Sequence, residues 1–405
     1  MPIRRLGRAC AVSALLFCPA PGASADPPRE VRALWIMRWS LSTPQSIRQI
    51  VAQARKNRFN TLFVQVRGRG DAWNRSELEP RAEALADAPA DYDPLALVVE
   101  EAHRAGMKVH AWMNTFLVWT GPRPPKSPRH VLNSRPDWIA RDHRNRFSTA
   151  NTQQCEGAFL QPSHPEVQEH LHRVFTDVAR RYDVDGIHFD YVRYPNADYD
   201  MSDGALARFR AWLEPRLTAS QRAAITRDGS RVAAVRVCRA QWEQWRRDQI
   251  TGLVRRIADT VHREKPWVQV SAAVFANAED AVTQRGQEWR RWLAEGIVDA
   301  VCPMAYSRDT GTVERQIRDA VAVAGDRHVY AGIGAWRLAP EDTVRKIDRA
   351  RRAGARGVAL FSYDNVTRNG RQSAYLDRVS RGAFPSRAAP PDMRWRSRRP
   401  EDREP

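Results

Sequence analysis

The chain alternates short apolar segments with longer amphipathic ones over about 350 of its residues. The short segments are rich in β-branched and aromatic residues, as strands are, and the longer ones repeat apolar residues at helical spacing. The predicted strands are 31–39, 60–67, 108–114, 185–192, 268–276, 300–307, 328–336 and 357–364. The predicted helices are 44–57, 94–105, 165–181, 239–264, 287–295, 312–324, 340–353 and 373–381.

Eight strands that are each followed by a helix predict an α/β fold of the (β/α)8 or TIM-barrel type. The alternative is an open, doubly wound sheet, which would require a glycine-rich phosphate-binding turn after the first strand. The sequence there is Arg38-Trp39-Ser40-Leu41, which is no such turn. Two connections, 115–164 and 193–238, are unusually long and follow the third and fourth strands, where barrel enzymes carry lids and binding loops.

Polar residues share one face on three consecutive predicted strands. Residues two apart on a strand point to the same side, and the opposite faces here are apolar and suit a helix layer. We therefore expect the polar face to point into the barrel. The polar residues aligned in this way are Gln65, Arg67, His110, Asn114, His188 and Asp190.

Asp190 lies at the carboxyl end of its strand, where barrel enzymes place catalytic groups. A buried carboxylate is costly unless it is paired, and His188, Arg67 or Arg193 could supply the partner. The structural alternative is an aspartate that only anchors a loop or pairs with Arg193. We expect His110 and His188 to shape the site, and aromatic residues near the strand ends, among them Tyr306 and Trp336, to contact a ligand.

The N-terminus has the order of a secretory signal peptide: three arginines, an apolar run and the small residues Ala23-Ser24-Ala25. Cleavage after Ala25 predicts export to the periplasm or the extracellular space. Lipid anchoring at Cys18 is the alternative, which the bulky Phe17 disfavours. No apolar run reaches the roughly 18 residues that cross a bilayer, so we expect no transmembrane span.

The net charge of +18 falls to near +15 when a signal peptide with three arginines is removed, and this charge favours anionic polymers as partners. No nucleic-acid-binding motif accompanies the charge, so we predict no nucleic-acid partner. Cys155, Cys238 and Cys302 would remain, with spacings of neither a zinc site nor a redox pair and at most one disulfide. We expect no metal and no cofactor.

The predicted domains are a signal peptide (1–25), one barrel domain (26–384) and a basic tail (385–405). The tail is rich in proline, arginine and glutamate, with a single tryptophan. This composition predicts disorder, because the tail cannot bury enough apolar surface to fold alone.

Seven motifs carry a family resemblance. In order they are VRALWI, FVQVRGRGDAW, DPLALVVEEAHRAGMKVHAWMN, LQPSHPEVQEHL, RYDVDGIHFDYVRYP, WLAEGIVDAVCPMAY and GVALFSYD. Over about residues 30–384 the chain resembles the glycosyl-hydrolase-like family 10 domain proteins of bacterial envelopes, which differ from the xylanases also numbered ten. The resemblance implies a TIM barrel, export and hydrolysis of cell-wall glycan strands.

The resemblance assigns the main site role to Asp190 of DGIHFD, followed by Gln65, His110, Asn114 and Tyr306. Family members often carry aspartates where this chain has Tyr191 and Gln161. Glycoside hydrolysis normally needs two carboxyl groups, of which only Asp190 is clear here. The second group stays open among Asp364, Glu279, Asp280 and Asp71, with Asp364 preferred, and an acetamido group of the substrate could replace it.

The sequence thus predicts an exported glycoside hydrolase of a cell-wall amino-sugar polymer, with peptidoglycan glycan strands as the first candidate. The alternatives are a catalytically inactive glycan-binding barrel and a hydrolase of an extracellular poly-N-acetylglucosamine-type polysaccharide. The predicted catalytic residues are Asp190 and Asp364. The predicted substrate-binding residues are Gln65, Arg67, His110, Asn114, His188, Arg193, Tyr306 and Trp336.

Overall fold

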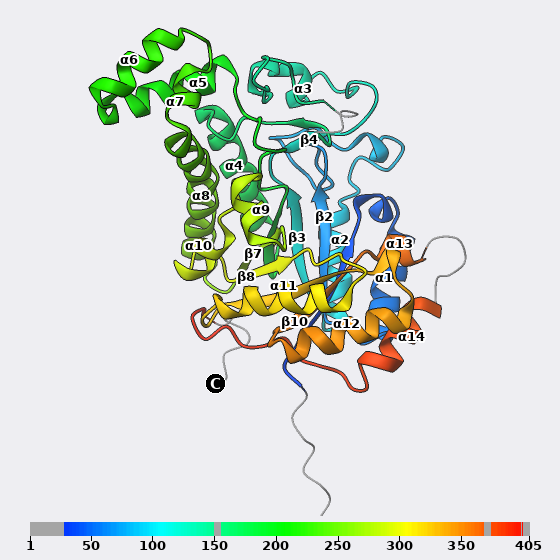
Figure 1. Ribbon diagram of the computed structural model, residues 1–405. Helices are drawn as coiled ribbons and strands as arrows, with labels where there is room; N and C mark the ends of the chain where they lie inside the picture. Colours follow the sequence, from blue (N-terminus) through cyan, green and yellow to red (C-terminus); the bar gives the residue numbers. More distant parts are fainter. Residues whose placement is uncertain (1–27, 150–154, 368–373, 398, 400–405) are drawn as a thin grey trace, which may run out of the picture.

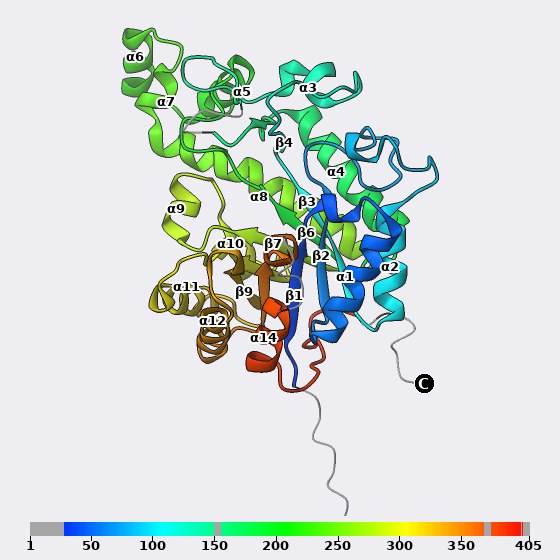
Figure 2. The same ribbon diagram turned by 90° about the vertical axis from the view of Figure 1, so that its right-hand side faces the viewer.

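The computed structural model describes residues 28–149, 155–367, 374–397 and 399. Eight parallel strands close into a barrel, in the order β1-β2-β3-β6-β7-β8-β9-β10, with β10 hydrogen-bonded back to β1 (Figures 1 and 2). The predicted TIM barrel is therefore confirmed. The strands are β1 (Val31–Ile36), β2 (Thr61–Arg67), β3 (Lys108–Asn114), β6 (Gly186–Asp190), β7 (Gln269–Val274), β8 (Ala300–Pro303), β9 (His328–Gly334) and β10 (Gly357–Phe361).

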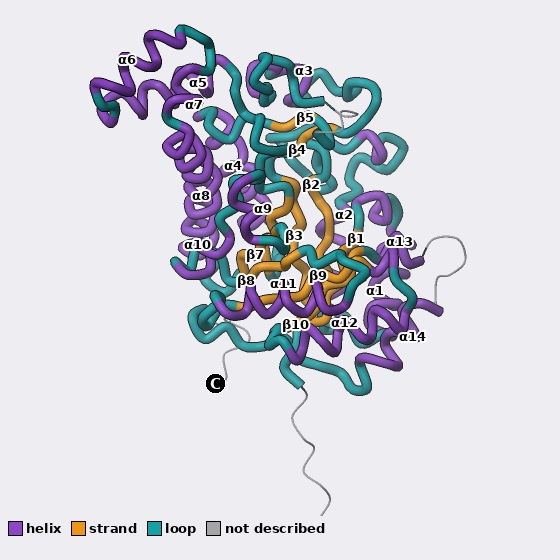
Figure 3. Tube along the Cα trace, in the orientation of Figure 1, coloured by secondary structure: helices purple, strands orange, loops and turns teal. Residues whose placement is uncertain are grey.

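One helix after each strand contributes to the outer layer, so that helices enclose the strands (Figure 3). These helices are α1 (Pro44–Lys56), α2 (Pro94–Arg104), α4 (Pro165–Arg181), α8 (Arg239–Glu264), α10 (Trp289–Ala294), α11 (Thr310–Ala322), α12 (Pro340–Arg352) and α14 (Ala374–Ala383). Four of them, α1, α2, α4 and α12, begin with proline, whose fixed φ suits the first helical position and which lacks an N–H that would be unpaired there.

Alternation along the strands produces two separate apolar cores. Leu34, Val64 and Val109 face outward and pack in the layer between strands and helices. Trp35 and Phe63 face inward and fill the barrel with residues from the other strands. The polar side chains of β2, β3 and β6 alternate with the outward residues, so most of them point into the barrel as the sequence predicts.

Both long connections fold at the carboxyl ends of the strands, at the top of Figure 1. The first contains the antiparallel pair β4 (Leu117–Trp119) and β5 (Ala158–Phe159) and the short helix α3 (Val131–Ser134). The second contains α5 (Asp203–Leu213), α6 (Ala219–Asp228) and α7 (Ala233–Val237). Its helices pack on the start of α8 through Phe209, Trp242 and Trp245, which gives this insertion its own small core.

The described part of the tail, 385–397 and 399, packs across the opposite end of the barrel, which corrects the prediction of disorder there. Its backbone pairs with the N-terminal segment, since the Glu30 N–H donates to the Ala389 carbonyl at 2.8 Å. The Trp395 indole donates to Asp299 at 2.7 Å, and Arg399 forms an ion pair with Asp185 at 3.0 Å. Composition indicates only whether the tail could fold by itself. In the folded protein the tail binds instead to carboxylates of the barrel, at the starts of β6 and β8.

The predicted signal peptide, 1–25, with Cys18, lies outside the described residues. Within the described ranges, no helix combines the length and apolar character needed to cross a membrane. Cys155, Cys238 and Cys302 are buried free thiols, none of them in a disulfide.

Candidate active site

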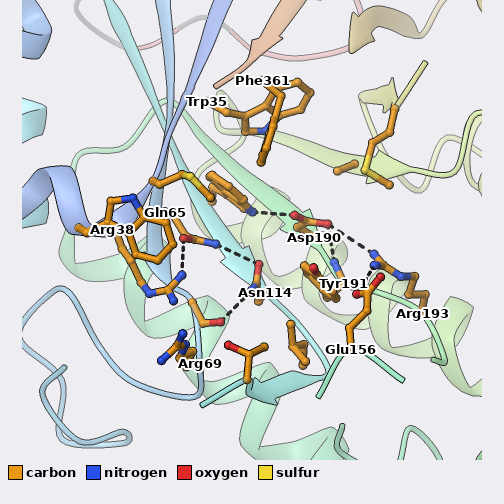
Figure 4. A pocket seen from close by; sticks show the side chains of 18 of the residues that line it. Trp35, Arg38, Gln65, Arg69, Asn114, Glu156, Asp190, Tyr191, Arg193 and Phe361 are labelled. Carbon is orange, nitrogen blue, oxygen red and sulfur yellow. Dashed lines mark hydrogen bonds and ion pairs between the residues drawn. The ribbon is translucent and has the colours of Figure 1, made fainter. Parts of the chain in front are cut away.

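A cavity of about 430 Å³ opens at the carboxyl ends of the barrel strands. Five predicted site residues line it together: Gln65, Asn114, Asp190 and Arg193, which Figure 4 labels, and Tyr306. The other five, Arg67, His110, His188, Trp336 and Asp364, do not line it.

Asp190 ends β6 and is 7% exposed. Its carboxylate accepts hydrogen bonds from the Trp112 indole at 3.1 Å and from the Tyr191 backbone N–H at 2.7 Å. Burial raises the pKa of Asp190 to about 6, although the Arg193 guanidinium, 3.8 Å away, and the two hydrogen bonds act in the opposite direction. The carboxyl group therefore exchanges its proton in mildly acidic solution.

Tyr191, directly after Asp190, has a φ of 47°, in the left-handed region that non-glycine residues rarely adopt. Such backbone strain concentrates at functional sites. The turn brings the Tyr191 N–H back onto the carboxylate of Asp190 and sets the Tyr191 ring 4.0 Å from the Arg193 guanidinium. Tyr191 thus holds Arg193 by a cation–π contact.

Arg193 lies between two carboxylates (Figure 4). Its guanidinium is 3.1 Å from Glu156 and 3.8 Å from Asp190. Glu156 lines the same cavity and is half exposed. Sequence reasoning missed this second carboxylate, because Glu156 lies in the long connection before β5, where no strand periodicity indicates which way a side chain points. The one signal in the sequence was that this connection follows the third strand, at the end of the barrel where active sites form.

Amide side chains form the wall across the cavity. Arg38 donates to the Gln65 carbonyl oxygen at 2.8 Å, and Gln65 in turn donates to Asn114 at 3.4 Å. Asn114 completes the series by donating to the Gly68 carbonyl at 2.8 Å. These bonds hold the polar ends of β2 and β3 in fixed orientations toward the cavity.

Aromatic residues form the rim on the side of β8 to β10. Tyr306 lines the cavity, and burial raises the pKa of its phenol well above the ordinary value, so the phenol stays protonated. Trp336 packs edge-on against Tyr306, with ring centroids 5.0 Å apart, and against Phe361 at 5.5 Å. Trp336 is 42% exposed, which leaves it at the rim as a surface on which a sugar ring could stack.

His188 lies inside the barrel beneath Asp190 and is completely buried. Its Nε2 accepts a hydrogen bond from the Trp35 indole at 3.1 Å, and its Nδ1 lies 2.8 Å from the Ser271 hydroxyl. An indole N–H can only donate, so Nε2 carries no proton. Burial also lowers the pKa of His188 well below its ordinary value. This neutral histidine orients Trp35, which lines the cavity.

His110 lies deeper still and faces the opposite end of the barrel, where it lines a second cavity beside the tail. Gly186 on the neighbouring strand makes room for its ring, because a Cβ there would lie 2.5 Å from the Nδ1 atom. Burial lowers the pKa of His110 to about 4. The predicted role of His110 in substrate binding is therefore not supported by its position.

Arg67 turns away from the cavity because β2 contains a bulge. The register with β3 shifts between Gln65 and Arg67, so that Arg67 lies opposite Met113 instead of Asn114. The extra residue reverses the facing that simple alternation predicts. Arg67 forms a fully buried ion pair with Glu79 at 2.6 Å, which makes it a structural residue.

Asp364, the preferred second catalytic group, lies apart from this cavity. Asp364 lines a separate depression beside Tyr363, where it accepts hydrogen bonds from the Met37 N–H at 2.7 Å and from the Ser40 hydroxyl. It anchors the turn after β1. The other candidates do not line the cavity either: Asp71, Glu279 and Asp280.

Gln161, which the sequence analysis singles out, also lies outside the lining of the cavity. Its amide donates to the Asp137 carbonyl at 2.6 Å and accepts from the Ser202 hydroxyl at 3.0 Å. Gln161 therefore ties the two long connections together. Within the described ranges, no three side chains of His, Cys, Asp or Glu come together as metal ligands would.

The sequence model of the glycosyl hydrolase-like 10 family matches residues 30–334. Glycosyl hydrolase YngK of Bacillus subtilis (strain 168) is 23% identical, over 92% of this chain and 75% of its own length. Glycosyl hydrolase DigH of Escherichia coli (strain K12) is 24% identical, over 71% of this chain and 69% of its own. Among solved structures, the PgaB (BpsB) glycoside hydrolase domain from Bordetella bronchiseptica is similar in fold, with a TM-score of 0.62 and 17% identity over 87% of this chain and 99% of that one.

Proposed function

We propose that this chain, which belongs to the glycosyl hydrolase-like 10 family, hydrolyses glycosidic bonds of a polysaccharide with Asp190 and Glu156 as its two carboxyl groups. One observation carries the proposal: both residues line one cavity at the carboxyl ends of the barrel strands, and the Arg193 guanidinium forms an ion pair with each of them. Asp364 has no part in the reaction.

Asp190 serves as the proton donor. A general acid must hold its proton near the working pH, and burial raises the pKa of Asp190 to about 6. As the bond to the leaving sugar breaks, the Asp190 proton passes to the glycosidic oxygen. Water supplies the hydroxyl group at the anomeric carbon, and a carboxylate of the pair takes up its other proton, which balances the proton that Asp190 gave to the leaving sugar.

Glu156 supplies the second carboxylate, which both the retaining and the inverting course require. Its ion pair with Arg193, at 3.1 Å, holds its carboxyl group at the cavity. Arg193 also orients the two carboxyl groups relative to each other, because its buried guanidinium contacts both.

The substrate we propose is an amino-sugar polymer of the cell envelope, with peptidoglycan glycan strands first, cleaved by an exported form of the protein. Three features support this choice: the signal-peptide pattern of residues 1–25, the net charge of +18 and the open, aromatic-rimmed cavity. A poly-N-acetylglucosamine-type polysaccharide is the competing substrate.

The test is the release of new reducing ends from purified glycan strands. Asp190→Asn and Glu156→Gln should each lower the rate at least about a hundredfold, the range for removing an acid–base group. Glu279→Gln is the matched control, because this glutamate is exposed on α9 (Ala278–Thr283) at the same end of the barrel. A wild-type protein that binds glycan strands but releases no reducing ends would instead be a binding barrel.

A further inference from the structure

Two more guanidinium groups line the candidate active site, those of Arg38 and Arg69. They come from different connections: Arg38 opens the short 3-10 helix that follows β1, and Arg69 follows β2. Figure 4 shows both on one side of the cavity, across from Asp190, Arg193 and Glu156. Arg38 is 8% exposed, so its charge is largely removed from solvent.

Unlike Arg193, neither of these arginines is paired with a carboxylate among the described residues. Arg38 donates one hydrogen bond, to the neutral Gln65 amide. The Arg69 side chain donates none there, and its Nε is buried without a partner. Asp71 accepts the Arg69 backbone N–H at 2.9 Å instead of its guanidinium, and it acts on Arg38 as a nearby charge without forming an ion pair among the described residues. This wall therefore holds two positive charges and several unused donors.

Aromatic rings and a glycine hold both guanidinium groups in place. The Arg38 guanidinium lies 4.5 Å from the Trp39 ring, and that of Arg69 lies 5.3 Å from the Trp119 ring. A Cβ at Gly68 would lie 2.6 Å from Arg38 Nη1, so any larger residue there would displace the guanidinium. Both groups are thus positioned without consuming their capacity to bind an anion.

We propose that Arg38 and Arg69 form a subsite for a carboxylate carried by a sugar unit of the substrate. The subsite rests on the proposed glycosidase function and gives it a substrate class: a glycan with lactyl ether or uronic acid carboxylates. Planar guanidinium groups bind carboxylates through paired hydrogen bonds, and two fixed positive charges repel the ammonium group of a de-N-acetylated amino sugar.

The electrostatics of the cavity agree with this assignment. Burial lowers the pKa of Arg38 to about 10, and the charge of Arg69 adds to that effect while Asp71 opposes it. A bound carboxylate would offset the repulsion between the two guanidinium groups. Charge-assisted hydrogen bonds from guanidinium groups to a carboxylate are stronger than those to a neutral sugar hydroxyl.

Binding is measured in the Asp190→Asn background, so that no ligand is consumed. The probes are a lactyl-bearing amino-sugar tetrasaccharide, an oligogalacturonate, and each compound after reduction of its carboxylates to alcohols. We expect the carboxylate form of one probe to bind at least about tenfold more tightly than its reduced form, as charge-assisted hydrogen bonds require. The probe that shows the difference identifies the source of the carboxylate.

Arg38→Gln and Arg69→Gln should each bring the ratio of the two affinities, carboxylate form over reduced form, toward one. Arg352→Gln, at a side chain that is 63% exposed on α12, should preserve the ratio. A normal melting curve for at least Arg69→Gln shows that the change is not a folding defect. Equal affinities for both forms of both probes, or a ratio unchanged in a folded Arg69→Gln protein, would refute the subsite. Preserved discrimination in a protein that cleaves no glycan would refute the glycosidase proposal and leave the subsite intact.

Discussion

At the scale of single residues, the surroundings of Asp190 raise the pKa of its carboxyl group and thereby reduce the stability of the fold. The carboxyl group is buried, its two hydrogen bonds come from neutral donors, and Arg193 lies at 3.8 Å, beyond hydrogen-bonding distance. The pKa of Asp190 is raised from 3.8 to about 6, so the folded protein holds a proton that the unfolded chain releases. Ionising Asp190 in the folded state therefore lowers the free energy of unfolding.

Asp190→Asn should accordingly stabilise the fold in a pH-dependent way. Below about pH 4 both states are protonated and the carboxyl group costs nothing. As pH rises from about 4 to about 6, the carboxyl group lowers the free energy of unfolding by a growing amount. Above that range the loss levels off at about 3 kcal/mol, the value for a pKa shift of roughly two units. Urea unfolding at pH 4 and pH 8 should show a stabilised variant only at pH 8. A variant less stable than wild type at pH 8 would contradict this account of the site.

The sequence predicts the site where side chains follow the period of a regular strand. Gln65, Asn114 and Asp190 line the cavity as alternation indicates. Arg67 fails because one extra residue in β2 reverses its facing, and a bulge leaves no mark on the hydrophobic pattern. Glu156 lies in a loop whose path depends on tertiary contacts, so its contribution to the site appears only in three dimensions.

At the scale of elements, the bulged end of β2 is stabilised by the Arg67–Glu79 ion pair. The two side chains are 1% and 2% exposed, and Arg67 also donates to the carbonyl groups of Asn114 and Thr115 at the end of β3. Burial alone would raise the pKa of Glu79, but Arg67 and His170 outweigh it and lower the pKa to about 2. This pair fixes the loop after β2, which carries Arg69, to the barrel.

Glu79→Gln should therefore destabilise the protein by about 3–5 kcal/mol at pH 7, because it leaves a buried arginine without its counter-ion. The stabilisation from Glu79 is fully present above about pH 4 and is lost as pH falls through about 2, so the difference from wild type should shrink across that range. Glu100→Gln, an exposed control with 63% side-chain exposure, should change stability by less than about 0.5 kcal/mol. A similar small effect for Glu79→Gln would show that the pair is dispensable.

The strands and outer helices of the barrel are predictable from sequence because each buries a continuous apolar face. All eight strands and the eight helices that follow them form near their predicted ranges. The helices within the connections, such as α6, are missed. No residue of α6 is buried, so α6 has no apolar stripe for periodicity to detect.

At the scale of the whole molecule, the tail binds the end of the barrel opposite the cavity. Trp395 packs edge-on against His328 with centroids 4.9 Å apart and donates to Asp299, which also pairs with Arg396 at 2.7 Å. Burial would raise the pKa of Asp299, but His262, Arg396 and backbone bonding lower it to about 2. The tail thus adds Trp395 and Arg396 to the partners that His262 and the Val270 N–H already give this buried carboxylate.

Truncation after Phe384 should lower the melting temperature by several degrees while leaving the cavity intact. Trp395→Ala should reproduce part of the loss, and Arg394→Gln, an exposed change in the same tail, should shift the midpoint by about a degree or less. Differential scanning calorimetry measures all three. An unchanged midpoint in the truncated protein would mean that the contacts of Asp299 and Asp185 with the tail contribute no net stability.

Closure of the barrel joins the earliest strand to the latest, since Val31 of β1 lies opposite Gly357 of β10 and Glu30 pairs with Ala389. A ribosome makes β1 first and β10 last, so one edge of the growing sheet stays unpaired through most of synthesis. Such an edge can pair with other chains. We therefore expect the nascent protein to depend on chaperones until its last strand emerges, and to acquire its melting transition only after translation is complete.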